Sequence, residues 1–548
     1  MSGQRTQVTD VLVVGGGLTG LTAALVLRHH GVPVILAEKH ATTSPQPKAR
    51  RFHMRTMEIF RELGLAGTVH AAARDLAGHD HMAAGRTLAE AEQLPLWQHA
   101  RPAAGSAGAA GSGGSAAAAG PSAAPASAVP PTVPPAAVPA EVSPEPPCLI
   151  AQDVLEPVLR QAAEDAGAGV RFETELTGFT QHDDHVAARL LDRRTGAEYE
   201  VRARYLLAAD GGRSPVREAL GVGRSGQGTF GGLVASVYFT ADLSDVVRGR
   251  EFNLCQIEHP DARGTLTSVD GRRRWVFAAP AVVPGAADPE RNWPAVLRTA
   301  LGVPAPDLGV RSVLTWRTEM LVADRYSAGR VHLLGDAAHV MPPFAASGAN
   351  TGIADAHNIG WKLAAVLRGE AAPELLDSYD AERRPAGWFA ADQSARRTAD
   401  LRAMAAGPDP SLAHPYVLAL GGFQYTDGAI ARDQVSAADP EPVTEFAPAG
   451  RVGTRIPHRW LDSARTRSTI DAAGPGWAIL TGPQARLMPG NQARPRTDDL
   501  PACRLEADFL APGESLLLRP DHVVAWRGEP GDTKVAGRVR ESVLSARE

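Results

Sequence analysis

The sequence predicts an α/β protein of several domains that opens with a Rossmann-like nucleotide-binding unit. Residues 10–14 have the pattern of a short buried strand, the glycine-rich segment Gly15–Gly20 follows it, and residues 21–30 have a helical pattern before a second predicted strand at 34–38. Residues 170–209 alternate apolar and polar positions with turn signals, as antiparallel strands do. A chain of 548 residues is also too long for one compact core, and we expect three domains.

The glycine-rich turn has the residues that a dinucleotide pyrophosphate requires. Gly15 permits the tight turn, Gly17 lets backbone amides approach the phosphates, and Gly20 lets the helix pack closely on the strand. The N-terminus of the following helix attracts the anion, and Glu38 can accept hydrogen bonds from an adenosine ribose. We therefore expect a dinucleotide to bind at Gly15, Gly17, Leu18, Thr19, Gly20, Glu38 and Lys39.

A second Gly-x-Gly-x-x-Gly match begins at Gly221. It follows a helix-like stretch, residues 214–220, rather than a strand, so we interpret Gly221 as the residue that ends this helix. The chain is therefore expected to contain one dinucleotide-binding fold.

Two later segments place acidic residues after predicted strands. Asp210 follows one strand and precedes a Ser-Pro helix start, an arrangement that many proteins share. Asp336 follows Gly335 after the apolar run 331–334, where its carboxylate is placed to bond the ribityl hydroxyls of a cofactor. Asn350 is predicted to cap a helix whose positive end would favour an anionic reduced isoalloxazine. The apolar face of that helix is Ile353, Ala356, Gly360, Leu363 and Leu367.

These segments occur in the order and at roughly the separations found in the class A FAD-dependent aromatic hydroxylases, and the sequence resembles that flavoprotein monooxygenase family over nearly its whole length. Within the family it most resembles the aromatic polyketide hydroxylases of actinomycete antibiotic pathways. Further segments that agree with the resemblance are Arg55–Phe60, Gln152–Glu156, Asp355–Leu363 and Tyr379–Pro385.

The resemblance implies three domains. They are a Rossmann-like FAD-binding domain of the GR2 type, an inserted β-sheet substrate domain and a C-terminal thioredoxin-like domain. The last has no Cys-x-x-Cys, so we expect it to be structural. We assign 1–75, 148–215 and 325–365 to the FAD-binding domain, 76–100, 216–324 and 366–400 to the substrate domain, and 401–548 to the C-terminal domain. Residues 101–147, rich in Ala, Gly, Ser and Pro, are expected to be a flexible surface insertion.

The resemblance also implies roles for individual residues. Gln152 would bond the phosphate or ribityl region of FAD, and Arg55 would lie near the cofactor. Arg383 is a candidate for contacting substrate oxygens, with a structural ion pair to Glu382 or Asp380 as the alternative. The other cofactor residues would be Asp210, Gly335, Asp336, Pro343, Gly348, Ala349 and Asn350, and the backbone at Pro342, Pro343 and Gly348 would lie near the flavin ring. We interpret His339 and His357 as structural.

The sequence departs from the family pattern in two places. Ala345 and Ala346 stand where adjacent glycines are usual, so the loop shape or flavin mobility can differ. Lys48 stands where an arginine is usual, and the bulky, basic residues 50–53 follow it.

By the resemblance, NADPH or NADH reduces FAD, and O2 then gives a C4a-hydroperoxyflavin that hydroxylates a polycyclic phenolic, polyketide-type substrate in secondary-metabolite biosynthesis. Two alternatives stay open, a Baeyer-Villiger oxygenase on the same scaffold and an FAD-binding pathway chaperone without turnover. A flavin halogenase is disfavoured because the Trp-x-Trp-x-Ile-Pro signature is absent.

Composition limits the partners. With 44% hydrophobic and 21% charged residues and a net charge of −5, the chain has no basic patch for nucleic acid or a membrane surface. Cys148, Cys255 and Cys503 lack metal-ligand spacing, so we expect no disulfide and no metal. The N-terminus leaves no room for a signal peptide and no apolar run reaches about 18 residues, so we expect a cytoplasmic monomer or homodimer without membrane insertion.

Overall fold

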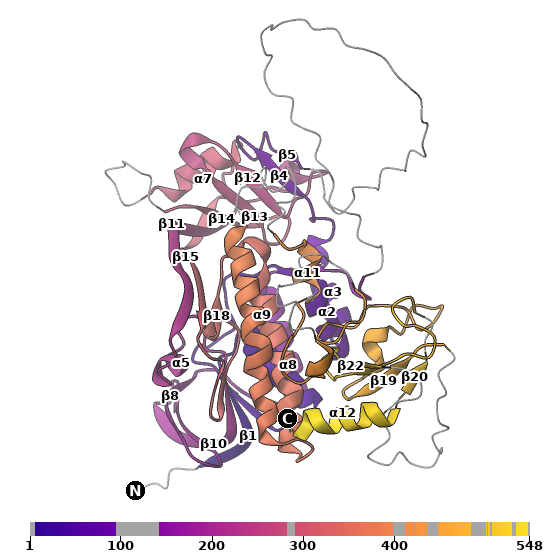
Figure 1. Cartoon of the computed structure of the whole chain (residues 1–548). Helices are drawn as coiled ribbons and strands as arrows, with labels where there is room; N and C mark the ends of the chain where they lie inside the picture. Colours follow the sequence, from indigo (N-terminus) through magenta and orange to yellow (C-terminus); the bar gives the residue numbers. More distant parts are fainter. Residues whose placement is uncertain are drawn as a thin grey trace, which may run out of the picture.

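The computed structural model describes residues 6–94, 142–281, 291–397, 412–421, 423–435, 448–483, 500, 502–504, 507–528 and 533–545 of the chain. Figure 1 shows a helix-covered sheet, a second sheet at one end and a smaller C-terminal unit at its side. The insertion expected at 101–147 lies outside the described residues up to position 141 and stays a prediction.

The first sheet is the predicted Rossmann-like unit. β1 (Gln7–Val14) pairs in parallel with β2 (Val34–Ala37) on one side and with β10 (Ala197–Ala208) on the other, and α1 (Leu18–His29) joins β1 to β2. β17 (Val331–Leu333) pairs in parallel with β10. The carboxyl ends of β1, β10 and β17 therefore meet at one edge, where ligands of parallel sheets bind. The sheet also contains β7 (Gly169–Arg171), β8 (Thr174–Gln181), β9 (Val186–Asp192) and β16 (Ser327–Ala328).

The core of this unit forms because its strands are apolar on both faces. Val11, Leu12 and Val13 are fully buried, as in parallel strands that helices cover on both sides. α8 (Ser347–Leu367) packs against α1, and a Cβ on Gly360 would lie 2.4 Å from Cγ1 of Val26. Glycine at 360 therefore allows the two helices to approach closely.

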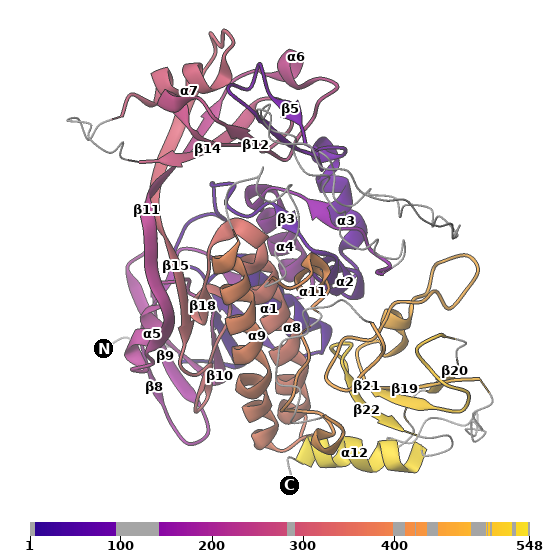
Figure 2. The same ribbon diagram turned by 45° about the horizontal axis from the view of Figure 1, so that its top comes forward.

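The second sheet has the order β18-β15-β11-β14-β13-β12-β4-β5. β11 (Arg224–Thr240) and β15 (Gly309–Ala323) are long antiparallel neighbours, and Figure 2 shows them running from the first sheet to the far end of the molecule. Trp275 and Phe277 fill its separate core. Its other strands are β4 (Met82–Gly85), β5 (Glu92–Gln93), β12 (Leu254–Ile257), β13 (Gly264–Ser268), β14 (Arg274–Pro280) and β18 (His339–Val340).

The remaining helices lie in different parts of the molecule, and α6 (Ser244–Val247) and α7 (Trp293–Leu301) contribute to the core of the second sheet. α8 lies beside α9 (Asp377–Arg396), as both figures show. Smaller elements are β3 (Arg51–Phe52), β6 (Cys148–Leu149), α2 (Met54–Glu62), α3 (Ala66–Ala72), α4 (Gln152–Asp165), α5 (Pro215–Ala219) and α11 (Pro415–Ala419). Gly221 follows α5 with φ +63°, so the second glycine motif ends a helix as predicted.

The C-terminal unit is a four-stranded mixed sheet with a final helix, α12 (Thr533–Ser545). β19 (Ala478–Thr481) pairs in parallel with β20 (Ala502–Arg504) and antiparallel with β21 (Ser515–Leu518), which pairs antiparallel with β22 (Val524–Gly528). This arrangement agrees with the thioredoxin-like expectation, and the predicted α/β class is confirmed. Trp477 stacks edge-on against Trp361 of α8 at 5.7 Å, which docks the unit on the first domain.

Within the part of the chain that the structure describes, none of the helices has both the length and the apolar character that crossing a bilayer requires.

Candidate functional site

Three segments that are far apart in the sequence meet at the N-terminus of α1. A Cβ on Gly335, which follows β17, would lie 2.6 Å from Oγ1 of Thr19, and a Cβ on Gly352 of α8 would lie 2.4 Å from the same atom. The same added Cβ on Gly352 would lie 3.0 Å from Cα of Gly335. The first turn of α1, the Gly335–Asp336 turn and the first turns of α8 therefore form one contiguous surface.

The glycine loop needs its glycines for geometric reasons. Gly15 has φ +107°, and a Cβ there would lie 2.2 Å from the carbonyl oxygen of Ala209 at the end of β10. A Cβ on Gly20 would lie 1.9 Å from the carbonyl oxygen of Gly15. Gly17 has more room, because its nearest neighbour is Oε1 of Glu156 at 3.7 Å. The loop thus has the tight turn and close helix packing of a pyrophosphate cradle.

The N-termini of α1 and α8 both leave backbone N–H groups for a ligand. Among the described residues, no side chain caps either helix, and Gly17 and Ala346 occupy the cap positions. Ala346 has φ +52°, the left-handed region that favours glycine, at a position where the family usually has one. An anion or a partial negative charge is stabilised at such helix ends.

The prediction that Asn350 caps α8 is wrong, because the helix begins at Ser347. Oδ1 of Asn350 accepts hydrogen bonds from the N–H of His53 at 2.8 Å and from the hydroxyl of Thr56 at 2.6 Å. Its Nδ2 donates to the carbonyl of Arg51 at 3.1 Å. Asn350 thus ties the start of α8 to the start of α2, and a contact with the cofactor stays a prediction.

Glu38 lies directly beside the glycine loop. Its Oε2 accepts the N–H of Gly16 at 2.6 Å, and its Oε1 accepts the N–H of His40 at 2.8 Å. The carboxylate therefore stands at the end of β2, where a ribose of a bound dinucleotide would meet it. Lys39 is exposed next to it.

The two aspartates after the strands have different surroundings. The carboxylate of Asp210 accepts hydrogen bonds from the hydroxyl of Ser214 at 2.6 Å and the N–H of Val216 at 3.0 Å, so it holds the start of α5. Asp336 has an exposed side chain, yet the protein surrounds it closely enough that burial raises its pKa. The side chain thus reaches solvent although protein atoms surround it. Asp336 is therefore accessible for ribityl hydroxyls.

Gln152 supports the loop from the side of α4. Its Oε1 accepts the N–H of Ala49 at 3.1 Å, and its Nε2 donates to Glu156 at 2.6 Å. Glu156, which is buried below Gly17, also accepts the N–H of Ser44 at 2.7 Å, and burial raises its pKa. Glu156 is a site residue that was not predicted, although it belongs to the Gln152–Glu156 segment that agrees with the family resemblance.

Arg55 and Arg383 are occupied by protein partners in this structure. Arg55 contacts Glu58 at 3.1 Å and donates to the carbonyl of Asp521 at 2.8 Å. Arg383 is buried and pairs with Asp355 at 2.8 Å rather than with Glu382 or Asp380. Its partner on α8, Asp355, was missed, because this residue lies outside the apolar face expected for that helix and only the fold shows that it is buried.

The proline loop leads into α8. Pro342 is buried and Pro343 exposed, and Gly348 and Ala349 are the second and third residues of the helix and are partly exposed. A Cβ on Gly348 would lie 3.7 Å from Cγ of Met341, so this site does not require glycine for space within the protein. Their closeness to a flavin ring stays a prediction.

The basic segment that departs from the family joins the first domain to the second sheet. Arg50 is buried and hydrogen-bonds the side chain of Asn253, next to β12, as well as its carbonyl at 3.2 Å. Burial lowers the pKa of Arg50 to about 9. Nearby, Gln46 donates to Ser312 of β15 at 2.9 Å. Arg50 of the bulky segment therefore serves the domain junction, whereas Phe52 packs in the core of the first domain.

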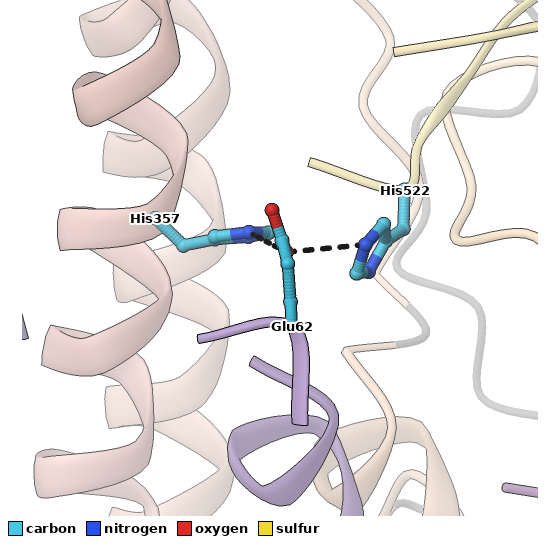
Figure 3. Close-up of side chains that lie close together, drawn as sticks. All are labelled: Glu62, His357 and His522. Atoms are coloured by element: carbon cyan, nitrogen blue, oxygen red, sulfur yellow. Dashed lines mark hydrogen bonds and ion pairs between the residues drawn. The ribbon is translucent and has the colours of Figure 1, made fainter. Parts of the chain in front are cut away.

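A separate cluster of three possible metal ligands lies where α2, α8 and the C-terminal unit meet. Oε2 of Glu62 lies 2.7 Å from Nε2 of His357 and 3.2 Å from Nε2 of His522, and Figure 3 shows the carboxylate between the two rings. Two imidazoles and a carboxylate are ligands that Zn²⁺ accepts.

Arg55 decides how these imidazoles are protonated. Its guanidinium lies 2.8 Å from Nδ1 of His522 and 3.3 Å from Nδ1 of His357, and a guanidinium only donates. Both Nδ1 atoms must then accept, so each neutral ring carries its proton on Nε2 and donates to Glu62. Burial lowers the pKa of His522, which favours the neutral ring. All four ring nitrogens thus take part in hydrogen bonds, while Oε1 of Glu62 has no hydrogen-bond partner among the described residues.

We therefore predict that Zn²⁺ added at an equimolar ratio leaves the unfolding temperature of the wild-type protein unchanged. Replacing Arg55 with methionine removes the donor to both rings, so in that variant their Nε2 atoms can bind the metal and Zn²⁺ is expected to raise the unfolding temperature. Differential scanning calorimetry with and without EDTA measures both. A zinc-dependent rise in the wild-type protein would contradict the tautomer assignment.

The geometry fits FAD. The Gly15–Gly20 cradle and Glu38 suit the adenosine diphosphate half, and the accessible Asp336 and the uncapped start of α8 suit the flavin half. Both halves meet at Thr19, so the surface is continuous enough for one extended dinucleotide.

Comparisons with known proteins agree with this geometry. A family model described as an FAD binding domain matches residues 8–394, and one described as the C-terminal part of aromatic-ring hydroxylases matches residues 449–545. A tetracenomycin A2 monooxygenase-dioxygenase from Streptomyces glaucescens is 37% identical over 98% of this chain and 96% of its own. An aklavinone 12-hydroxylase from Streptomyces peucetius is 37% identical over 89% of this chain and 94% of its own.

A solved structure extends the likeness to the fold. The ternary complex of aklavinone-11 hydroxylase with FAD and aklavinone superposes with a TM-score of 0.77 at 29% identity, and the match covers 98% of this chain and 99% of the other. Sequence and fold thus agree over both matched segments, and the chain belongs to the FAD-dependent aromatic hydroxylases, in the group that contains the polyketide hydroxylases.

Proposed function

We propose that the protein hydroxylates a polycyclic phenolic, polyketide-type substrate in antibiotic biosynthesis, with NADPH or NADH as electron donor and O2 as oxygen source. The main support is that three segments, the start of α1, the Gly335–Asp336 turn and the start of α8, meet at Thr19. Together they provide one continuous surface for FAD. The names of the relatives, which include a putative polyketide hydroxylase, support the substrate class. The cytoplasmic location and the monomeric or homodimeric state expected from the sequence belong to the same proposal.

FAD, when bound, supplies the redox and oxygen-transfer chemistry. The protein would hold the pyrophosphate at Gly15–Gly20, the adenosine ribose at Glu38 and the ribityl chain at Asp336. The N–H groups at the start of α8 would stabilise negative charge on the reduced ring. No Ser-His-Asp triad is needed for this reaction.

The second sheet is proposed to cover the substrate. Arg50 to Asn253 and Gln46 to Ser312 bind the segment before α2 to this sheet, and Arg274 of β14 pairs with Asp153 of α4 at 2.6 Å. The sheet is thereby held over the domain that carries the cofactor residues. A substrate enclosed there is shielded from water, which hydroxylation requires.

The experiment measures NADPH and NADH oxidation with and without aklavinone or a tetracenomycin-type phenol under heavy-isotope O2. We expect the substrate to accelerate oxidation and the product to gain one labelled oxygen on an aromatic carbon. Labelled oxygen inserted beside a ketone would indicate a Baeyer-Villiger oxygenase. Tight substrate binding without oxygen incorporation for any phenol would indicate a pathway chaperone and contradict the proposal.

A further inference from the structure

A buried carboxylate holds both ends of the turn that contains Asp336. Oδ2 of Asp355, on α8, accepts the N–H of Gly335 at 3.1 Å and lies 2.7 Å from Nε2 of His339. Asp336 stands between these two anchors with its side chain exposed. Asp355 therefore fixes the backbone that presents Asp336.

Arg383 extends this support across α9. Its Nε donates to Oδ1 of Asp355 at 2.8 Å, and its Nη1 donates to the hydroxyl of Tyr425 at 2.9 Å. Burial by itself would raise the pKa of Asp355, but Arg383 and His339 outweigh it and hold this pKa below its usual value. The carboxylate thus stays ionised and accepts from the N–H of Gly335 and from Nε2 of His339, at the two ends of the turn.

Tyr425 belongs to the core of the C-terminal unit. It is buried in one cluster with Val452, Leu516 and Val524, and its N–H donates to the carbonyl of Gly453 at 2.9 Å. A side chain of the C-terminal unit therefore ends a continuous series of hydrogen bonds that starts at the Gly335 amide.

We propose that Tyr425 is a positioning residue for the flavin half of the cofactor, acting through Arg383 and Asp355 on the Gly335–Asp336 turn. The inference rests on the proposed function, in which this turn holds the ribityl chain. The position of Asp336 depends on the side chains that fix its turn. The guanidinium of Arg383 is held in one orientation when Asp355 and Tyr425 both hydrogen-bond it. The C-terminal unit, which lacks a dithiol, would thus contribute to cofactor geometry.

The variant Tyr425→Phe tests this, because it keeps the ring and removes only the hydroxyl. Tyr326→Phe is the matched control. Tyr326 is buried, its ring centroid lies 6.0 Å from that of His339, and its hydroxyl has no hydrogen-bond partner among the described residues. The full chains, freed of flavin, are titrated with FAD and with ADP well below their unfolding temperatures. ADP occupies only the Gly15–Gly20 half of the site.

We expect Tyr425→Phe to weaken FAD binding by about three- to tenfold and to leave ADP binding unchanged, since one hydrogen bond to a charged group is lost. Asp355→Asn should weaken FAD binding further, and Tyr326→Phe should leave both affinities unchanged. Equal FAD affinity of Tyr425→Phe and wild type would overturn the inference, as would a parallel loss of FAD and ADP affinity. A wild-type chain that binds ADP but not FAD would instead overturn the proposed function on which the inference rests.

Discussion

Replacing Gly20 with valine is expected to weaken FAD binding by about 100-fold or more, a cost of about 3 kcal/mol, and to abolish turnover with it. A Cβ at this position would lie 1.9 Å from the carbonyl oxygen of Gly15, a backbone atom of the loop that forms the pyrophosphate cradle. The contact can be relieved only by moving α1 away from the loop. Flavin fluorescence titration measures the affinity directly.

Gly67→Ala is the control for this substitution. Gly67 lies in α3, and a Cβ there would meet no described atom within 4 Å. Alanine should leave FAD affinity unchanged and raise the stability of the helix by about 0.5–1 kcal/mol. Near-normal FAD affinity of Gly20→Val would show that the cofactor does not use this cradle.

Replacing Glu382 with glutamine is expected to destabilise the protein by about 3–5 kcal/mol. The fully buried carboxylate accepts from Nζ of Lys362 at 2.8 Å and from both Nη atoms of Arg519 at 2.7 and 2.9 Å. Asn358 and the N–H of Ala429 also donate to it, at 2.7 and 2.8 Å. An amide has one acceptor oxygen and no charge, so the buried Lys362 would lose its main counter-ion and the buried Arg519 would keep only Asp521.

Urea denaturation of Glu382→Gln and of a surface control, Glu370→Gln, measures the effect. Glu370 pairs with Arg368 in an exposed position, so its loss should cost less than about 0.5 kcal/mol. Equal decreases in the free energy of unfolding of the two variants would contradict the expected contribution of the buried cluster to stability.

The same buried cluster predicts that the protein loses folding stability as the pH falls into the acid range. Burial by itself would raise the pKa of Glu382, but Arg519 and Lys362 outweigh it and hold the pKa well below its usual value of 4.5. A carboxyl with a depressed folded-state pKa stabilises the protein above its unfolded pKa, and this contribution is lost as the pH falls below about 4.5. Glu382→Gln should therefore show a weaker loss of stability with acid than the wild-type protein.

Local patterns account for the parts of the fold that the sequence predicts well. The strand at 10–14 and the helix after Gly20 are present as β1 and α1, with the helix starting three residues earlier, because their apolar runs and the glycine turn act within one unit. The antiparallel strands at 186–191 and 199–205 are present as β9 and β10 for the same reason.

Long-range partners account for what the sequence does not reveal. Asn350 has a cap residue's side chain, but residues 51–56, nearly 300 positions away, take up its hydrogen bonds. Arg383 pairs with Asp355, and Arg55 contacts His522 from the C-terminal unit, because folding brings these charges together where burial demands a partner. Charge and helix periodicity reveal that such residues need partners but not which partners they find.

The most direct test of the account is a crystal structure of the protein with FAD. We expect the pyrophosphate at the N-terminus of α1, the adenosine ribose at Glu38, the ribityl chain at Asp336 and the isoalloxazine at the N-terminus of α8. Electron density that places the flavin ring away from α8, or the pyrophosphate away from the Gly15–Gly20 loop, would contradict the single continuous site proposed here.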